Sequence, residues 1–156
     1  MAAWRRRQPD PAVIVIDPSA PILFVDDDRA DRMVIQVVLE RSALPNPVRG
    51  FDGGAALLEY IASAASGAEP APALVLVDVN MPGMTGFDVV KRIRAYEQFR
   101  ELPPVSMLTS SDAEDDKIRA AEVGADNYLA KQSGVDAFVA MIDAAFAAKL
   151  TDQGAV

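Results

Sequence analysis

Residues 74–78 read Leu-Val-Leu-Val-Asp, a run of four apolar residues that ends at a carboxylate. The same rhythm occurs at residues 22–26, Ile-Leu-Phe-Val-Asp, and a similar one at residues 105–109, Val-Ser-Met-Leu-Thr. A continuous apolar run is typical of a strand that is buried on both faces, as strands of parallel sheets are. We therefore predict central strands at these three places, each followed by a polar group.

The segments between these runs have the spacing of helices. We expect further strands at 48–51 and 127–130, and helices at about 29–42, 55–65, 86–96, 113–123 and 135–149. In the first of these helices Met33, Val34 and Val37 lie on one side. Five strands that alternate with five helices predict an α/β fold, a doubly wound five-stranded parallel sheet with helices on both faces.

Three of the predicted helices are preceded by residues with the spacing of a capping box, in which a hydroxyl and a carboxylate bind the backbone N–H groups at a helix start. The pairs are Thr85 with Asp88, Ser111 with Glu114, and Ser133 with Asp136. These pairs support the predicted helix starts.

The composition restricts both the organisation and the chemistry. A length of 156 residues suits one domain, which we expect at residues 21–150, between an N-terminal extension at 1–20 and a tail at 151–156. The formal charge of -8 argues against DNA, RNA or an anionic membrane as the main partner. The absence of Cys and His excludes disulfides, thiolate and imidazole metal ligands, and His-based triads.

Targeting signals are weak. No apolar run approaches the roughly 20 residues that span a bilayer. The apolar stretch that follows the basic start is too short for a signal-peptide core. Residues 13–16 within this stretch could form an added strand or belong to a tail. We expect a cytoplasmic protein, and because only seven residues follow Lys149, we expect no DNA-binding or enzymatic output domain.

Polar groups collect after the predicted strands. In sheets of this kind the ligand crevice lies beyond the carboxyl ends of the strands. The residues that follow the strands there are Asp26, Asp27 and Asp28, then Asp78, Thr109 and Lys131. Two carboxylates about 4 Å apart repel by roughly 4 kcal/mol at an effective dielectric of 20, so acids that converge on one crevice require a cation or a shared proton.

These groups suggest a magnesium-assisted phosphoryl transfer. A site with few carboxylates and several waters suits Mg²⁺, held by Asp26, Asp27 and a backbone carbonyl just past Asp78. Asp78, which stands alone at the central strand, is the best nucleophile for an aspartyl phosphate. Lys131 supplies a fixed cation and Thr109 a hydroxyl to stabilise the transferred group.

The residues resemble the receiver domain of two-component response regulators. The matching stretches are 22–28 (ILFVDDD), 74–86 (LVLVDVNMPGMTG), 105–111 (VSMLTSS) and 128–131 (YLAK). Together they anchor residues 20–150 and imply the flavodoxin-like receiver fold.

The resemblance implies roles for single residues. Asp78 would accept a phosphoryl group from a phosphohistidine of a partner sensor histidine kinase. The chain would catalyse its own phosphorylation and dephosphorylation without being an enzyme for other substrates. Asp27 would contact Mg²⁺ directly and Asp26 mainly through water, and the backbone carbonyl of Asn80 would complete the metal site.

The resemblance also implies a switch. Thr109 and Tyr128 match a pair in which the hydroxyl moves to the phosphoryl group and the aromatic ring turns inward. The surface formed by residues 113–123, 127–130 and 135–149 would change most. We expect this surface to contact the kinase, a phosphotransfer protein or a second copy of the chain in a homodimer.

Two features depart from the common family pattern. Gln132 follows the lysine where family members usually have Pro, and the linker 66–72 is longer than in chemotaxis-type regulators. Together with the expected absence of an output domain, these features resemble single-domain regulators that are paired with bacterial phytochromes, so a bacteriophytochrome is the expected kinase.

Two other readings remain open. Asp26 and Asp28 form an Asp-x-Asp after the first strand, as in phosphatases with an aspartate nucleophile. The second alternative is an interaction module that keeps the fold and never takes phosphate.

Overall fold

The computed structural model describes residues 17–110 and 114–147, and it contains the predicted five-stranded parallel sheet. The strands are β1 (Ile22–Val25), β2 (Val48–Phe51), β3 (Leu74–Asp78), β4 (Val105–Thr109) and β5 (Asn127–Ala130). Their order across the sheet is β2-β1-β3-β4-β5, and every pair is parallel. Each predicted strand is present, so the predicted fold class is confirmed.

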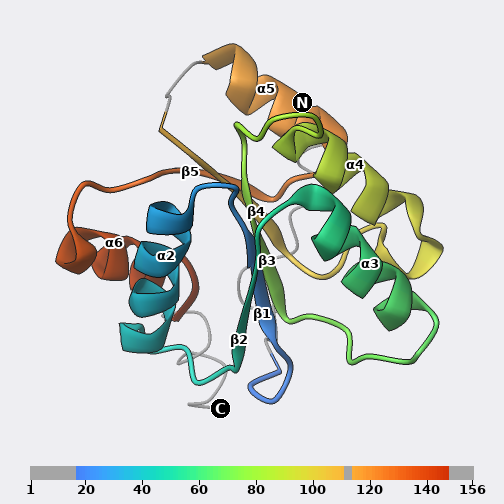
Figure 1. Cartoon of the computed structure of the whole chain (residues 1–156), viewed down its shortest axis with the longest axis horizontal. Helices are drawn as coiled ribbons and strands as arrows, with labels where there is room; N and C mark the ends of the chain where they lie inside the picture. The colour runs from blue at the N-terminus through green and yellow to red at the C-terminus, as the bar shows by residue number, and fades with distance from the viewer. Residues whose placement is uncertain (1–16, 111–113, 148–156) are drawn as a thin grey trace.

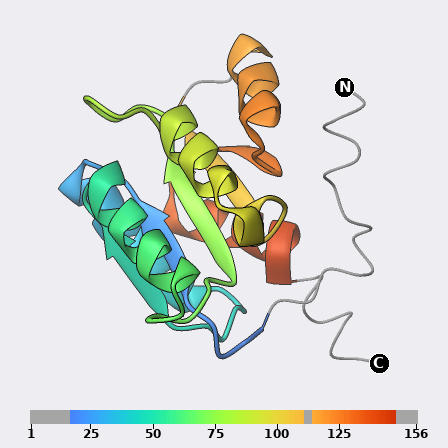
Figure 2. The ribbon, with the colours of Figure 1, turned by 90° about the vertical axis from the view of Figure 1, so that its right-hand side faces the viewer.

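Helices cover both faces of this sheet (Figure 1). The helices are α2 (Arg29–Arg41), α3 (Gly54–Ala65), α4 (Gly86–Ala95), α5 (Glu114–Val123) and α6 (Val135–Ile142), with a 3₁₀ turn at Glu97–Phe99 and a π-helical turn at Asp143–Ala147. α2 and α6 pack on one face, and α3, α4 and α5 lie on the other, and Figure 2 shows α3 and α4 on the face that is turned to the viewer. The chain is therefore a three-layer α/β domain.

The alternation of side chains along each strand divides the core in two. On β1, Leu23 and Val25 belong to the cluster under α3, α4 and α5, while Ile22 and Phe24 belong to the cluster under α2 and α6. These side chains are at most 2% exposed, which explains why the strands read as continuous apolar runs. The polar residue that ends each run is thereby placed at the carboxyl edge of the sheet.

The sequence places Met33, Val34 and Val37 on one side of α2, and the structure shows that this side is exposed. Met33, Val34 and Val37 are 61%, 37% and 40% exposed, whereas the buried face carries Ile35, Val38 and Leu39. The apolar pattern of this helix covers most of its circumference, so spacing alone did not distinguish the two sides.

Two helix ends also differ from the prediction. The Thr85–Asp88 capping box is present at α4, but α6 begins after Gly134 with no side-chain cap, so the predicted pair at Ser133 is wrong. The α-helix expected at 135–149 ends at Ile142 and continues as the π-helical turn.

The chain before β1 is fastened to the domain at residues 17–20. The buried amide of Asn46 donates to the carbonyl oxygens of Asp17 and Ala20, at 2.7 and 2.9 Å. The predictions for residues 13–16, for the cap at Ser111 and for the tail at 151–156 lie outside the described residues. Within residues 17–110 and 114–147, no helix combines the length and apolar character needed to cross a membrane.

Candidate functional site

The loop after β1 carries the acidic pair. Asp26 is 1% exposed, while Asp27 is exposed. Asp28 is the N-cap of α2, and its carboxylate accepts from the backbone N–H of Asp31 at 2.9 Å. The backbone N–H of Asp28 in turn donates to Asp26 Oδ1 at 2.9 Å. Asp28 therefore shapes the loop and starts the helix, and it holds Asp26 in place.

A residue that the sequence analysis did not single out fixes the same loop. Arg32 Nη1 donates to the carbonyl oxygens of Asp26 and Asp27, at 2.9 and 3.1 Å. The guanidinium thus supplies hydrogen-bond donors to two backbone carbonyl oxygens in the loop after β1, which lies outside the sheet. Its position one turn after the Asp28 cap was the available signal, since a side chain there reaches back toward the helix start.

Asp78 is the last residue of β3 and is 5% exposed. The chain then turns away and returns at Gly86, whose N–H donates to the carbonyl oxygen of Val79 at 3.0 Å. A Cβ atom at Gly86 would collide with the carbonyl oxygen of Asp78. Glycine at this position therefore allows α4 to begin directly against the strand end that carries the buried carboxylate.

Lys131 connects these acids. It follows β5, and its backbone N–H donates to the carbonyl oxygen of Thr109 at 2.7 Å. Its Nζ lies 2.7 Å from Asp26 Oδ2, 3.0 Å from Asp78 Oδ1 and 3.0 Å from Asp31 Oδ2. Asp31, on the first turn of α2, is the second residue of the site that the sequence analysis missed.

The electrostatics of the site disfavour the ionised form of Asp78. Burial, together with the negative charges of Asp26 and Asp27, raises the pKa of Asp78 from 3.8 to about 6, although the hydrogen bond from Lys131 opposes the shift. Burial alone would lower the pKa of Lys131, but its hydrogen bonds to the three carboxylates outweigh burial and raise it above the ordinary value. The lysine therefore stays positively charged, but its single charge does not balance the negative charges of the carboxylates around it.

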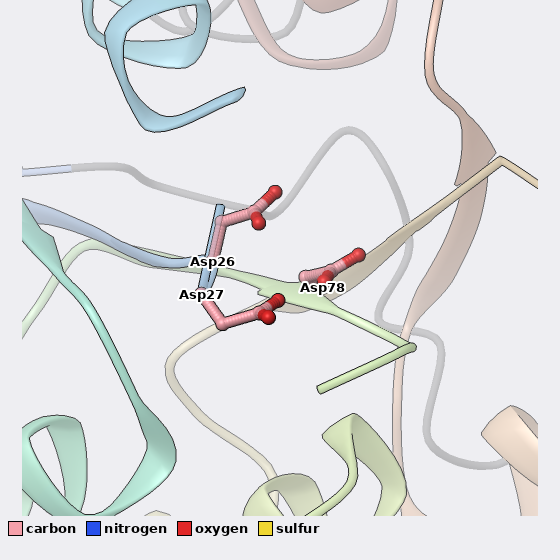
Figure 3. Close-up of side chains that lie close together, drawn as sticks. All are labelled: Asp26, Asp27 and Asp78. Carbon is pink, nitrogen blue, oxygen red and sulfur yellow. The ribbon is translucent and has the colours of Figure 1, made fainter. Parts of the chain in front are cut away.

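The acids are arranged for a hard cation. One carboxylate oxygen from each of Asp26, Asp27 and Asp78 lies within 4.8 Å of the other two. Figure 3 shows these three side chains grouped beyond the ends of β1 and β3. An oxygen-only donor set with an exposed member suits a divalent ion that retains water. Asn80, whose carbonyl was predicted as a further ligand, is exposed in the loop that follows β3.

The predicted switch residues lie on the two neighbouring strands. Thr109 ends β4, is fully buried and is in register with Ala130 of β5. Tyr128 is half-buried on β5 and lines a hollow of about 310 Å³ beside α5, together with Ile118 and Ala121. Thr109 thus lies at the carboxyl edge of the sheet, and Tyr128 lies at the α5 surface.

The residue in place of the usual Pro has contacts of its own. The Gln132 side-chain amide donates to the carbonyl oxygen of Ala130 at 2.9 Å and lies 3.6 Å from Met141 Sδ. These contacts hold the loop after β5 against α6. Gln132 therefore makes side-chain contacts at the position where the family pattern has a proline ring.

A doubly wound parallel sheet in this order, with carboxylates and a lysine at its carboxyl edge, defines the class of flavodoxin-like α/β domains whose site lies at the strand ends. The family model described as "Response regulator receiver domain" matches residues 22–143, and the chain belongs to this family.

Relatives with known names agree with this assignment. Sensory transduction protein RegX3 of Mycolicibacterium smegmatis is 35% identical over 123 residues, which are 79% of this chain and 49% of that protein. The probable methanogenesis regulatory protein FilR2 of Methanothrix harundinacea is 33% identical over 110 residues, 70% of either chain. The chain thus spans about half the length of the first relative.

Solved structures show the same fold. The bacteriophytochrome response regulator RtBRR is 36% identical, with a TM-score of 0.67 over 85% of this chain and 78% of that one. The response regulator RPA3017, in red light signaling of R. palustris, is 29% identical with a TM-score of 0.72 over 81% and 91%. The Mn(2+)-bound form of response regulator Rcp1 is 29% identical with a TM-score of 0.68 over 80% and 92%.

Proposed function

We propose that this chain is a response regulator that accepts a phosphoryl group on Asp78 from the phosphohistidine of a partner sensor histidine kinase. The observation that carries the proposal is the position of Asp78, which is buried, 3.0 Å from Lys131 Nζ and grouped with Asp26 and Asp27. A nucleophile, a fixed cation and a cation-binding pair are what phosphoryl transfer to a carboxylate requires. Membership of the receiver family supports the same role.

The proposed transfer is a displacement at phosphorus. An oxygen of Asp78 attacks the phosphorus atom, and the bond from phosphorus to the imidazole nitrogen of the kinase breaks. The ring, protonated at its other nitrogen, leaves as neutral imidazole, and Asp78 becomes an acyl phosphate. Lys131 donates to the transferred oxygens. A Mg²⁺ ion held by Asp26, Asp27, Asp78 and the Asn80 carbonyl would neutralise their charge.

The same groups support the later loss of the phosphoryl group by hydrolysis. Water attacks the phosphorus atom, the bond to the Asp78 oxygen breaks, and inorganic phosphate leaves with the carboxylate restored. The chain therefore catalyses only its own phosphorylation and dephosphorylation. The acidic cluster is consistent with a divalent ion in general, and the preference for Mg²⁺ is part of the proposal.

Phosphorylation would shift a two-state surface. The phosphoryl group adds nearly two negative charges, and the Thr109 hydroxyl, drawn to it, vacates space for Tyr128 to turn inward. A shift from 1:99 to 99:1 needs about 5.5 kcal/mol of differential interaction, and charge-assisted hydrogen bonds of about 1.5–3 kcal/mol each could supply much of it. The α5–β5–α6 surface, where Tyr128 lies, is the proposed contact for a partner or for a homodimer.

The partner we favour is a bacteriophytochrome-type kinase in the cytoplasm, or a phosphotransfer protein that receives from it. The support is the likeness to a bacteriophytochrome response regulator at 36% identity and to a response regulator in red light signaling. The linker at 66–72 and Gln132 point the same way.

The two alternatives have less support. Asp28, the acid that a phosphatase would need, is occupied as the N-cap of α2, and Asp26 is buried against Lys131. In an interaction module that takes no phosphate, the contacts of Lys131 with three carboxylates would have no functional role.

The proposal is tested with acetyl phosphate and Mg²⁺ as a small-molecule donor. Intact-mass spectrometry should show a gain of one phosphoryl group in the unmodified chain, none when the metal is removed by chelation, and none in Asp78→Asn. Asp26→Asn should slow the gain without abolishing the acceptor. A phosphatase would instead lose the covalent phosphate in Asp26→Asn and retain it in Asp78→Asn, and a pure interaction module would never gain mass.

A further inference from the structure

The ammonium group of Lys131 is already in contact with three carboxylates. A protonated lysine has three N–H donors, and Lys131 Nζ lies 2.7–3.0 Å from the carboxylates of Asp26, Asp78 and Asp31. Asp26 and Asp31 each accept a hydrogen bond from Nζ, and Asp78 forms an ion pair with it. A phosphoryl group on Asp78 would bring additional oxygens to the same ammonium, so one of these contacts would have to weaken.

The three contacts differ in how firmly they are held. The side chains of Asp26 and Asp78 are 1% and 6% exposed, whereas that of Asp31 is 48% exposed. Asp26 is also fixed by the backbone N–H of Asp28. Asp31 and Lys131 face an open hollow of about 230 Å³ between α2 and the loop after β5. Water can therefore solvate Asp31 when its contact is lost, which makes it the contact that yields most easily.

We propose that Asp31 competes with the phosphoryl group for Lys131 and so weakens the affinity of the site for that group. The inference rests on the proposed function, since it assumes that Asp78 is the acceptor. Asp31 would be a positioning residue that acts through Lys131 and does not touch the reacting atoms. The Asp31 carboxylate would hold Lys131 Nζ on the α2 side in the unphosphorylated protein, and this contact would be lost on phosphorylation.

The charge at this edge supports the direction of the effect. Asp26, Asp27, Asp31 and Asp78 bring four negative charges, against the positive charge of Lys131, which contacts three of these carboxylates, and that of Arg32, which contacts the loop carbonyls. Asp31 and a phosphoryl oxygen that both contact Nζ lie no more than about 6 Å apart, because each contact is about 3 Å long. Like charges at such a distance repel even where water screens them. Removing the charge of Asp31 should therefore favour the phosphoryl group.

The test uses beryllofluoride with Mg²⁺ as a phosphoryl mimic, with bound and free populations counted by ¹⁹F NMR. Asp31→Asn should bind beryllofluoride about three- to tenfold more tightly than the unmodified chain, and added salt should narrow the difference. Asp31→Glu, which keeps the charge, should restore the unmodified affinity. Asp52→Asn is the matched control, because Asp52 is an exposed carboxylate after β2 and is not among the three that Lys131 contacts.

The outcomes separate this inference from the proposed function. If the unmodified chain binds beryllofluoride and Asp31→Asn binds it with equal or lower affinity, the proposed competition between Asp31 and the phosphoryl group is refuted. Asp31 would then only hold α2 against Lys131 after β5. An equal gain in Asp52→Asn would also refute it, because general charge would then be the cause. If the unmodified chain does not bind the mimic with Mg²⁺, the proposed function fails and this inference fails with it.

Discussion

Asp78→Asn should stabilise the metal-free protein at neutral pH. The carboxyl of Asp78 is buried beside Asp26 and Asp27, and this environment raises its pKa from 3.8 to about 6. Because the pKa in the folded state lies above that of the unfolded chain, the stabilising contribution of this group is complete below about pH 4. It is lost as the pH rises through about 6. At pH 7.5 the folded protein therefore carries the full cost of an ionised Asp78.

The size of this cost follows from the shift. About 2 pKa units at about 1.36 kcal/mol each give about 3 kcal/mol at pH 7.5. Asparagine has nearly the same shape and cannot ionise, so the variant should gain up to this amount. The gain should shrink as the pH falls from 6 toward 4, because the wild-type carboxyl then takes up its proton.

Urea unfolding followed by circular dichroism, at several pH values and with a chelator present, measures this difference. Asp52→Asn, which removes an exposed carboxylate at the same edge, should change the unfolding free energy by no more than about 0.5 kcal/mol. Saturating Mg²⁺ should close most of the gap, since the wild-type site gains a counter-ion and the variant loses a ligand. A variant that is less stable than the wild type at pH 7.5 without metal would refute the electrostatic reasoning.

Three further substitutions test other parts of the structure. Lys131→Met should slow phosphorylation by acetyl phosphate at least about tenfold, measured as the initial rate by intact mass, because the transferred group loses its fixed cation. Thr85→Ala should cost about 1 kcal/mol in urea unfolding through loss of the α4 cap, while Ser133→Ala should cost less than about 0.5 kcal/mol. Arg94→Met should cost about 3–5 kcal/mol, because the buried guanidinium lies 2.9 Å from the Asp126 carboxylate and donates to the carbonyl oxygens of Gly124 and Pro103, and the variant loses all three contacts.

Each of these expectations has a clear contrary result. An unchanged initial rate in Lys131→Met would remove the lysine from the transfer step. Equal losses at Thr85 and Ser133 would mean that the two hydroxyls contribute alike, against the observed caps. A cost below about 1 kcal/mol for Arg94→Met would show that the contacts of the buried guanidinium contribute little to stability.

The fold could be predicted because its strands are buried on both faces. In β1 and β3 four apolar residues in a row precede an aspartate, and β4 has a similar run that Ser106 interrupts; such runs are visible without any knowledge of long-range contacts. The orientation of α2 was less accessible. Its apolar residues spread around the helix, so the buried side was decided by packing against α6 and the sheet.

The site was predictable in part for a related reason. Parallel strands bring their carboxyl ends to one edge, and this places Asp26, Asp78 and Lys131 together from widely separated positions. Asp31 and Arg32 were missed because they lie inside a helix, where charged residues ordinarily face solvent. Their roles depend on how the first turn of α2 is oriented against Lys131 and the β1 loop, which the sequence pattern does not specify.

The most direct test of the central claim is to locate the phosphorylated residue. The protein is incubated with acetyl phosphate and Mg²⁺, the acyl phosphate is reduced with borohydride, and the modified aspartate is identified by peptide mass spectrometry. The account predicts modification of Asp78 alone. Modification of Asp26 or Asp27 with Asp78 intact, or no modified aspartate under conditions that phosphorylate a known receiver domain, would contradict it.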